Sequence, residues 1–443
     1  MIDSKAETPA VAAGREARRA AFDVMRQVLR QGHGLESAIL AAPRWQQLTT
    51  RDKAFARYLV ATVLRHLGQI DAAIAACLDK PLKGKLAAVH DLLRLGAAQV
   101  LFMDVPAHAA VGETVGLATG VRVGPHKGLL NAVLRRLTRE GSALLAAQDA
   151  PVLNTPKWLW QSWVAAYGET VARRLAQQHL VEPPLDISLV DPVQRDAWAE
   201  RLGAQILPTG SLRLPPGTGD VRRLPGYDDG AWWVQDAAAA LPVRLLGDIR
   251  EREVLDLCAA PGGKTAQLAA AGAKVLAVDR APERLQQLVG NLKRLSLAAA
   301  TVAADVEDWT PPQQPDAILL DAPCTATGTL RRHPDIAHLK RPGDVPAMAD
   351  LQGALLHAAA GMLAPGGTLV YAVCSLQPEE GPERIGSLFA ARGDMKRVPI
   401  TPGEGADLGD FITPEGDLRT LPHHLADWGG MDGFYACRLQ KMP

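Results

Sequence analysis

The sequence predicts a protein of several domains: an all-α domain first, then a small α+β linker domain, and a C-terminal α/β domain with a parallel, doubly wound sheet. Three observations support this prediction. The 443 residues suffice for two or three domains of ordinary size. Apolar residues recur at helical spacing up to about residue 140. From residue 251 onward, short apolar strands alternate with helical segments.

The N-terminal domain is expected over residues 15–140, after a disordered Ala- and Pro-rich tail over residues 1–14. In its last predicted helix the apolar side chains share one face, and three arginines fall outside that face. The apolar positions are Leu130, Val133, Leu134 and Leu137. Gly and Pro separate the predicted helices, and no β-alternation is visible, which favours an all-α domain.

Charge is distributed unevenly along the chain. The whole chain has 48 Lys+Arg and 48 Asp+Glu, so its formal net charge is zero. Residues 1–140 hold 20 of the basic and 12 of the acidic residues, a net charge of about +8 that leaves about −8 for the remainder. Solvated helix faces explain this asymmetry as well as a polyanion-binding surface does, and charge alone does not decide between them.

Residues 141–250 are predicted to form the small α+β linker domain, because prolines break this segment into short strands and turns. Three tryptophans crowd one stretch of it, at Trp158, Trp160 and Trp163. Their spacing favours a packing cluster over a platform on which nucleic-acid bases stack.

Composition excludes several other classes of protein. No apolar run reaches the roughly 18 residues that a membrane span needs, and the polar start of the chain lacks an apolar signal core. The five cysteines are widely spaced, without a CxxC pair or a Cys/His cluster of zinc spacing. We therefore expect no membrane segment, no metal site and a reducing cytoplasm, in which a thiol is free to react.

The C-terminal domain, residues 251–443, is expected to contain six strands, with helices over residues 281–294 and 345–363. The predicted strands cover residues 254–258, 274–279, 300–305, 316–321, 367–375 and 434–439. In a doubly wound sheet, ligands bind at the carboxyl ends of the strands. Residues that follow these strands are therefore the first candidates for a functional site.

A glycine-rich turn, DLCAAPGGKT, follows the first of these strands. It is not a phosphate-binding P-loop, because the position five residues before Gly263 is Cys258 rather than glycine. The dinucleotide motif GxGxxG is also absent. Asp279, Asp305 and Asp321 end the next three strands, and together they line one crevice with the turn. Carboxylates in this position accept ribose hydroxyls, which favours an adenosine ligand that is not a triphosphate.

Two cysteines lie at strand ends of the same crevice. Cys324 follows the fourth strand and Cys374 closes the fifth, whereas Cys77, Cys258 and Cys437 are expected to be structural. Carbon 5 of a pyrimidine is a weak nucleophile, and addition of a thiolate to carbon 6 makes it reactive enough to accept a methyl group. A second group must then remove the proton from carbon 5. The two thiols therefore indicate pyrimidine C5 methylation.

These motifs resemble a known family. LDLCAAPGGKT, AVDRAPERL, DAPCTATGTLRRHPDI and LVYAVCSLQPEE are similar to the bacterial 16S ribosomal RNA cytosine-5 methyltransferases of the RsmB (Fmu/Sun) type. VPAHAAVGETV and NAVLRRL resemble the NusB-like RNA-binding domain that this family carries at its N-terminus. The resemblance covers about residues 15–443. It implies a Rossmann-like class I methyltransferase domain, an RNA-binding linker and a monomeric enzyme that acts on 16S rRNA.

The resemblance also implies residue roles. Cys374 is the expected nucleophile, Cys324 the thiol that assists release, and Asp321 a group that reaches the edge of the target cytosine. The ammonium group of Lys264 is expected to form an ion pair with the carboxylate of the methionine part of S-adenosylmethionine. The residues implied to bind S-adenosylmethionine are Cys258, Ala259, Ala260, Pro261, Gly262, Gly263, Lys264, Asp279, Asp305 and Asp321. The residues implied to border the RNA are Arg135, Arg136, Arg331, Arg332 and His333.

Departures from the family pattern and two alternative functions remain at this point. In the linker, PPLDISLV stands where an Arg-Val-Asn stretch is common in the family. Threonine is common before the nucleophile, where this chain has Val373. A non-catalytic RNA-binding or antitermination factor would use the helical domain alone and would not bind S-adenosylmethionine. A transfer RNA substrate would leave the enzyme chemistry unchanged.

Overall fold

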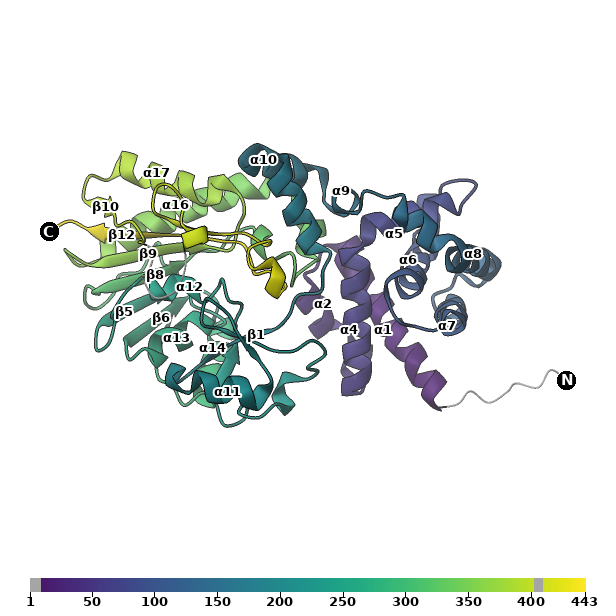
Figure 1. Ribbon diagram of the computed structural model, residues 1–443, viewed down its shortest axis with the longest axis horizontal. Helices are drawn as coiled ribbons and strands as arrows, with labels where there is room; N and C mark the ends of the chain where they lie inside the picture. Colours follow the sequence, from purple (N-terminus) through teal and green to yellow (C-terminus); the bar gives the residue numbers. More distant parts are fainter. Residues whose placement is uncertain (1–8, 402–408) are drawn as a thin grey trace. The chain divides into compact units, whose positions relative to one another are not determined.

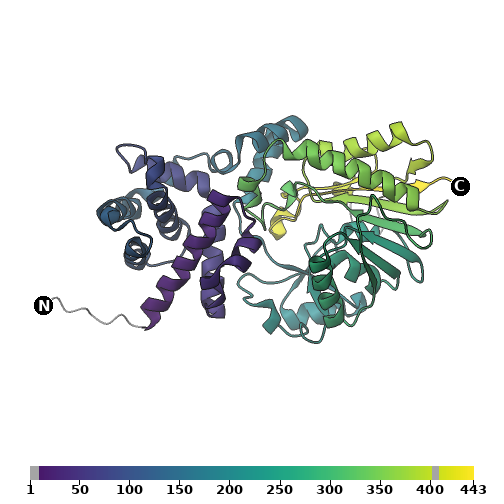
Figure 2. The same cartoon turned by 180° about the vertical axis from the view of Figure 1, so that it is seen from behind.

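The computed structural model describes residues 9–401 and 409–443, which form two units. The helical unit comprises the described residues up to Val164, Glu169–Leu180 and His333–Lys340. The sheet unit comprises Ala165–Gly168, Val181–Arg332 and the described residues from Arg341 onward. Each unit is drawn in Figures 1 and 2.

The helical unit confirms the all-α prediction for the N-terminal domain. Its helices are α1 (Pro9–Gln31), α2 (Leu35–Ala41), α3 (Pro43–Gln46), α4 (Thr50–Arg65), α5 (Leu67–Ala76), α6 (Ala87–Phe102), α7 (Ala107–Gly120), α8 (Lys127–Ala146), α9 (Ala150–Asn154), α10 (Lys157–His179) and α15 (Ile336–Leu339). Local sequence explains where α4 begins, since Thr49 accepts a hydrogen bond from the backbone N–H of Asp52 at 3.2 Å. The predicted face of α8 is buried in the core of this unit.

A short segment from the C-terminal half of the chain, His333–Lys340, belongs to the helical unit. The carboxylate of Asp335 accepts the backbone N–H of Leu35 at 2.9 Å. The residue before α2, Gly34, has no side chain that could cap the helix, so Asp335 provides that acceptor. Leu339 packs against the helical core, and the ring of His338 lies 2.7 Å from the carbonyl oxygen of Leu64.

The main sheet of the sheet unit confirms the predicted α/β fold. Its strand order is β10-β12-β9-β8-β5-β6-β7, with β11 paired to β12. Strands β5 to β9 are parallel, and β12 runs antiparallel to β9. The strands are β5 (Glu253–Leu257), β6 (Lys274–Asp279), β7 (Ala300–Ala303), β8 (Ala317–Asp321), β9 (Thr368–Val373), β10 (Met395–Arg397), β11 (Leu418–Thr420) and β12 (Phe434–Lys441).

Helices cover both faces of this sheet, as a doubly wound fold requires. Figure 1 shows α16 and α17 in light green on one face and α12 to α14 in teal on the other, and the view from behind in Figure 2 agrees. These helices are α12 (Leu241–Arg244), α13 (Gly263–Ala270), α14 (Pro282–Arg294), α16 (Asp344–Met362) and α17 (Pro382–Ala391). Successive strand residues are buried on opposite faces, as Leu319 and Leu320 illustrate.

The predicted linker domain is divided between the two units. Helix α8 continues past residue 140, and α9 with most of α10 belongs to the helical unit. Strands β1 (Asp186–Leu189), β2 (Gln205–Ile206), β3 (Leu212–Arg213) and β4 (Trp232–Val234) form a small antiparallel sheet in the sheet unit, together with α11 (Arg195–Leu202). Proline spacing indicated short strands correctly but gave no signal for this division.

Other sequence predictions also need correction. Helix α1 begins at Pro9, so the expectation of a disordered tail is wrong for residues 9–14, while residues 1–8 lie outside the described residues. Strands β10 and β11 were not predicted, because both are only three residues long. Of the three tryptophans, only Trp163 is fully buried, against His179 of the helical unit.

Within residues 9–401 and 409–443, no single helix has the length and apolar composition of a membrane span; α4 and α5 meet these criteria only as a pair, and they are bent by 75°.

Candidate active site

Two thiols lie side by side at the carboxyl edge of the main sheet. The Sγ atoms of Cys324 and Cys374 are 3.4 Å apart, and both cysteines are free. Cys374 directly follows β9, and Cys324 lies three residues beyond the end of β8. These strands are parallel neighbours, with Asp321 opposite Ala372, so the sheet register brings the two segments together. The structure thus unites the two cysteines that the sequence predicted.

A buried carboxylate, Glu380, connects the segments that carry the thiols. It accepts the backbone N–H of Thr325 at 2.8 Å and the hydroxyl of Ser375 at 2.6 Å. The hydroxyl of Thr325 and the amide of Gln352 also donate to it. Thr325 follows one cysteine and Ser375 follows the other, so Glu380 fixes both loops. The sequence analysis did not identify this residue.

A close backbone contact adds to this connection. The N–H of Gly328 donates to the carbonyl of Cys374 at 2.9 Å. A Cβ atom at Gly328 would lie 2.0 Å from the carbonyl oxygen of Gly433, so only glycine fits there. The segment after Cys324 is therefore anchored to the backbone of Cys374 itself.

The surroundings of the two sulfur atoms differ electrically. Its hydrogen bond with Cys374, followed by burial, raises the pKa of Cys324 well above the usual value of a thiol. Cys324 therefore stays protonated. The guanidinium group of Arg332 interacts electrostatically with Cys374. Burial alone would lower the pKa of Arg332, but the charges of Asp432 and Asp236 raise it, so this residue stays cationic.

Arg331 is not available to RNA, contrary to the prediction. It is fully buried, and its guanidinium lies 2.9 Å from Asp236 and 3.5 Å from Asp432. Arg332, partly exposed, donates to Asp432 at 2.7 Å. The two arginines and two aspartates neutralise each other in the interior, which is why the Arg-Arg pair is not a surface patch. His333 belongs to the helical unit.

The glycine-rich turn lies at the same edge of the sheet. Gly262 has a φ of +99°, and a Cβ atom there would meet Leu288 of α14 at 2.7 Å, so the turn requires glycine. The turn leads into the N-terminus of α13, where backbone N–H groups are free to meet an anion. Burial raises the pKa of Cys258 to about 12, which keeps this thiol neutral and fits its predicted structural role.

Four carboxylates accompany the turn. Asp256 is fully buried and accepts the hydroxyl of Thr265 at 2.6 Å, while its Oδ1 atom has no hydrogen-bond partner among the described residues. Burial raises its pKa to about 7. Asp279, at the end of β6, accepts the backbone N–H groups of Ala260 and Ala281. Asp305 is exposed, two residues beyond β7.

The fourth carboxylate, Asp321, forms an ion pair with Lys264 at 2.7 Å. The ammonium group of Lys264 also lies 5.0 Å from the ring centre of Phe434. Lys264 therefore has a carboxylate partner within the chain, which the sequence analysis did not predict.

This set of groups fits an adenosine ligand with an amino-acid end. A carboxylate accepts up to about four hydrogen bonds, so Asp279 and Asp321 retain capacity for hydroxyl and amino donors. The unpaired oxygen of Asp256 and the free N–H groups of α13 are further polar groups at this edge. Negative side chains also suit a ligand that carries a positive charge.

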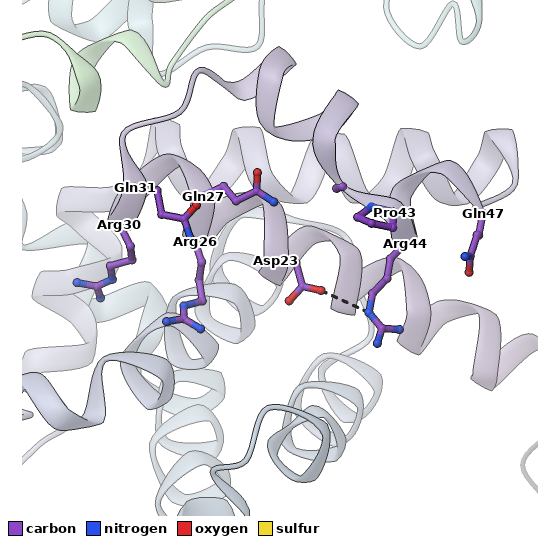
Figure 3. Close-up of a pocket in the computed structure, with 9 residues that line it drawn as sticks. Asp23, Arg26, Gln27, Arg30, Gln31, Pro43, Arg44 and Gln47 are labelled. Atoms are coloured by element: carbon purple, nitrogen blue, oxygen red, sulfur yellow. Dashed lines mark ion pairs between the residues drawn. The ribbon is translucent and has the colours of Figure 1, made fainter.

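The helical unit has a polar groove of about 720 Å³ between α1 and α3. Figure 3 shows its arginines extending to the same side, with an ion pair between Asp23 and Arg44. Arg26 and Arg30 approach the buried Asp91 at 3.4 and 2.7 Å. The lining comprises Asp23, Arg26, Gln27, Arg30, Gln31, Ala42, Pro43, Arg44 and Gln47.

The arginines predicted to contact RNA on α8 lie on its outer side. Arg135 is exposed and bonds to Asn131 of its own helix at 3.0 Å. Arg136 forms an ion pair with Glu140 one turn later, at 2.7 Å. Both are accessible, but neither lines the groove.

Comparison with known proteins gives a consistent result. Two family models match the chain: 16S rRNA methyltransferase RsmB/F over residues 244–440, and the NusB family over residues 15–139. Ribosomal RNA small subunit methyltransferase B from Klebsiella pneumoniae is 37% identical over 416 residues, which cover 89% of this chain and 96% of the relative.

Solved structures share the fold. The crystal structure of PH0851 matches with a TM-score of 0.73 and 21% identity, over 96% of this chain and 99% of that one. NSun6 from Pyrococcus horikoshii, solved with SFG, matches with a TM-score of 0.53 and 20% identity, over 65% of this chain and 98% of that one.

Proposed function

Because this chain belongs to the RsmB/F family of 16S rRNA methyltransferases, we propose that it methylates carbon 5 of a cytosine in 16S rRNA through a covalent bond to Cys374. The observation that carries this proposal is the pair of thiols 3.4 Å apart at the carboxyl edge of the sheet. Methylation of an exocyclic nitrogen would require neither thiol, since the nitrogen lone pair reacts directly.

The cofactor is S-adenosylmethionine, which supplies an electrophilic methyl group when bound. The turn from Cys258 to Lys264 would hold it, with carboxylates accepting its hydroxyl and amino groups. Asp279 would accept ribose hydroxyls. The role predicted for Lys264 requires this side chain to share its charge between Asp321 and the carboxylate of the cofactor.

The proposed reaction begins at Cys374. Its thiolate attacks carbon 6 of the cytosine, a sulfur–carbon bond forms, and the electrons of the C5–C6 double bond become available at carbon 5. Arg332, which stays cationic, interacts electrostatically with Cys374, and Cys324 retains its own proton. Asp321 accepts a hydrogen bond from the edge of the cytosine and so orients the ring.

Carbon 5 then takes the methyl group and carries a methyl group and a hydrogen together. Loss of that proton to a base assisted by Cys324 restores the double bond, the bond between carbon 6 and Cys374 breaks, and the product is released. Where Cys324 itself is that base, its own proton first passes to solvent water, and its thiolate then takes the proton from carbon 5 and ends as the neutral thiol. Its raised pKa makes it a strong base once it is deprotonated.

The target base must leave any base stack before it can reach two thiols at the edge of a sheet, so a flipped or single-stranded cytosine is required. We propose that the helical unit supplies phosphate contacts through its polar groove, the exposed Arg135 and the partly exposed Arg136. The groove arginines are better placed for this role than the buried Arg331.

The experiment is a methyl-transfer assay with 16S rRNA and labelled S-adenosylmethionine, followed by nuclease digestion to identify the methylated nucleoside. The wild-type protein is expected to produce 5-methylcytidine. Cys374→Ala is expected to reduce transfer to background, because no other sulfur lies at carbon 6. Cys77→Ala, a cysteine of the helical unit, is the matched control and should retain wild-type activity.

Full activity of the Cys374→Ala variant would refute the covalent mechanism. A product methylated on nitrogen would refute carbon 5 as the acceptor, and methylation of transfer RNA in preference to 16S rRNA would refute the substrate.

A further inference from the structure

The sheet unit contains a pocket of about 670 Å³ that the proposed reaction does not use. One wall comes from β1 and the small sheet, and the other comes from α12 and the last turn of α13. The cofactor turn lies at the opposite end of α13, which spans about 12 Å at 1.5 Å per residue. The lining includes Ser188, Leu189, Val190, Arg195, Ser211, Trp233, Val243, Arg244, Ile249, Gln267 and Arg438.

Two guanidinium groups converge in this pocket beside Gly210. The position of a Cβ atom on Gly210 would lie 3.5 Å from Cζ of Arg195 and 3.4 Å from Nη2 of Arg244. Burial lowers the pKa of Arg244, and the nearby positive charge of Arg195 lowers it further. In the described part of the chain, no carboxylate forms an ion pair with Arg195. Such a pair of guanidinium groups matches the geometry of a phosphate.

The pocket also contains a hydroxyl without a partner. Ser211 is 3% exposed, and its Oγ atom has no hydrogen-bond partner among the described residues. The neighbouring Thr209 is fully buried and its hydroxyl is also unpartnered. Buried polar groups without partners are rare because removing such a group from water without giving it a hydrogen bond is unfavourable. An acceptor oxygen on a ligand would satisfy the Ser211 hydroxyl next to the two arginines.

The rest of the wall is apolar. Leu189, Val190, Val243 and Ile249 line it together with Trp233. A volume of this size accommodates a ligand of nucleotide size, and apolar walls with a few convergent polar groups are typical of such sites. The lining therefore suits a phosphate attached to a flat organic group better than a bare anion.

We propose that this pocket binds a nucleoside phosphate, with the phosphate on Arg195 and Arg244 and the base against the apolar wall. The nucleotide comes either from a free pool or from a stretch of RNA outside the methylated position. This proposal goes beyond the methyl transfer, because none of the residues it uses belongs to the thiol pair or the cofactor turn.

The test is titration calorimetry of the full chain with CMP, with a short single-stranded RNA and with inorganic phosphate, all at one salt concentration. Arg195→Gln is expected to weaken binding of CMP, of RNA or of both at least tenfold, as loss of a charge-assisted hydrogen bond predicts. The matched control is Arg201→Gln, an exposed arginine of the same helix that does not line the pocket, and it should stay within twofold of wild type.

The outcomes distinguish the source of the nucleotide. Tight CMP binding that depends on Arg195 supports a free nucleotide. RNA binding that depends on Arg195 without CMP binding, with photo-crosslinks in residues 188–211, supports an RNA nucleotide. Equal affinities of the Arg195→Gln and Arg201→Gln variants for both probes would overturn the proposal, as would inorganic phosphate binding as tightly as both. The Cys374→Ala variant should bind the probes normally, so failure of the proposed reaction is separable from failure here.

Discussion

The carboxyl edge of the main sheet has two halves that differ in how their polar groups are satisfied. At the thiol half, Glu380 accepts hydrogen bonds from Thr325, Ser375 and Gln352, so donors of the chain itself satisfy both oxygens of this carboxylate. At the turn half, Asp256 has an oxygen without a partner among the described residues. The N-cap residue of α13, Gly262, also has no side chain to accept a hydrogen bond from the first turn of the helix.

This difference matches what each half must do. A covalent catalyst requires its two sulfur atoms at a fixed separation, and a buried carboxylate that accepts hydrogen bonds from both thiol-bearing loops holds them there. A cofactor site must exchange its ligand at every turnover, so some of its hydrogen-bonding capacity is left for the ligand. We infer that the thiol half is organised before substrate binds, whereas the turn half is completed by the cofactor.

The largest expected effect comes from breaking the organised half. Glu380→Ala would leave the buried N–H of Thr325 and the hydroxyl of Ser375 without their acceptor, which costs about 1–3 kcal/mol per group. The loops that carry the thiols would shift, and misplacement of about 1 Å lowers a rate by about 100-fold. We expect kcat to fall by about that factor while KM for RNA changes little, as measured by steady-state methyl transfer.

Glu380→Gln and Glu383→Ala serve as comparisons for this variant. The glutamine retains one acceptor oxygen and should restore part of kcat. Glu383 is an exposed residue of α17, and its removal should leave kcat unchanged. Wild-type kcat in a folded Glu380→Ala variant would show that the thiols do not depend on this network.

A smaller effect is expected at the turn half, from Asp256. Its folded pKa of about 7 lies above the unfolded value of about 3.9. The folded state therefore binds this proton more tightly, and the resulting stability is present below about pH 4 and is lost as pH rises through 7. Asp256→Asn lacks this titration. As the pH rises from 5 to 8, the stability of the variant relative to the wild type should therefore increase by about 3 kcal/mol, as measured by urea unfolding.

Asp308→Asn, at an exposed aspartate, is the control for that experiment and should show a much smaller change over the same range. A constant difference between the Asp256→Asn variant and the wild type from pH 5 to pH 8 would contradict the buried, proton-binding carboxylate.

The sequence predicted the parts of this site that depend on local pattern. The alternation of strands and helices placed both cysteines at one sheet edge, because parallel neighbours end there. The turn was recognisable because Gly262 has to occupy a backbone conformation and a space that exclude side chains. Val373 departs from the family pattern, yet its side chain is buried in the core on the face with α16, and the next residue points to the opposite face. The missing hydroxyl therefore lies on the opposite face of the sheet from the Cys374 side chain, on the face against which Cys324 packs.

Other parts could not be predicted from local pattern. Glu380 stands in a stretch of charged residues that suggests exposure, and its burial depends on partners 28 and 55 residues away. The burial of Arg331 depends on aspartates 95 and about 100 residues away. The segment with Asp335 reads as part of the C-terminal domain, and only the fold shows that it caps a helix of the helical unit. In each case a charged side chain bonds to a group far away in the sequence, which hydrophobic periodicity does not encode.

The most direct test of the central claim is to trap the proposed bond between Cys374 and the cytosine. Cys324→Ala removes the group that assists release, so after incubation with 16S rRNA and S-adenosylmethionine a protein–RNA adduct should persist on a denaturing gel. Mass spectrometry of the digested adduct should locate the nucleotide on Cys374. An adduct on another residue, or none in a folded variant that has lost turnover, would contradict the account.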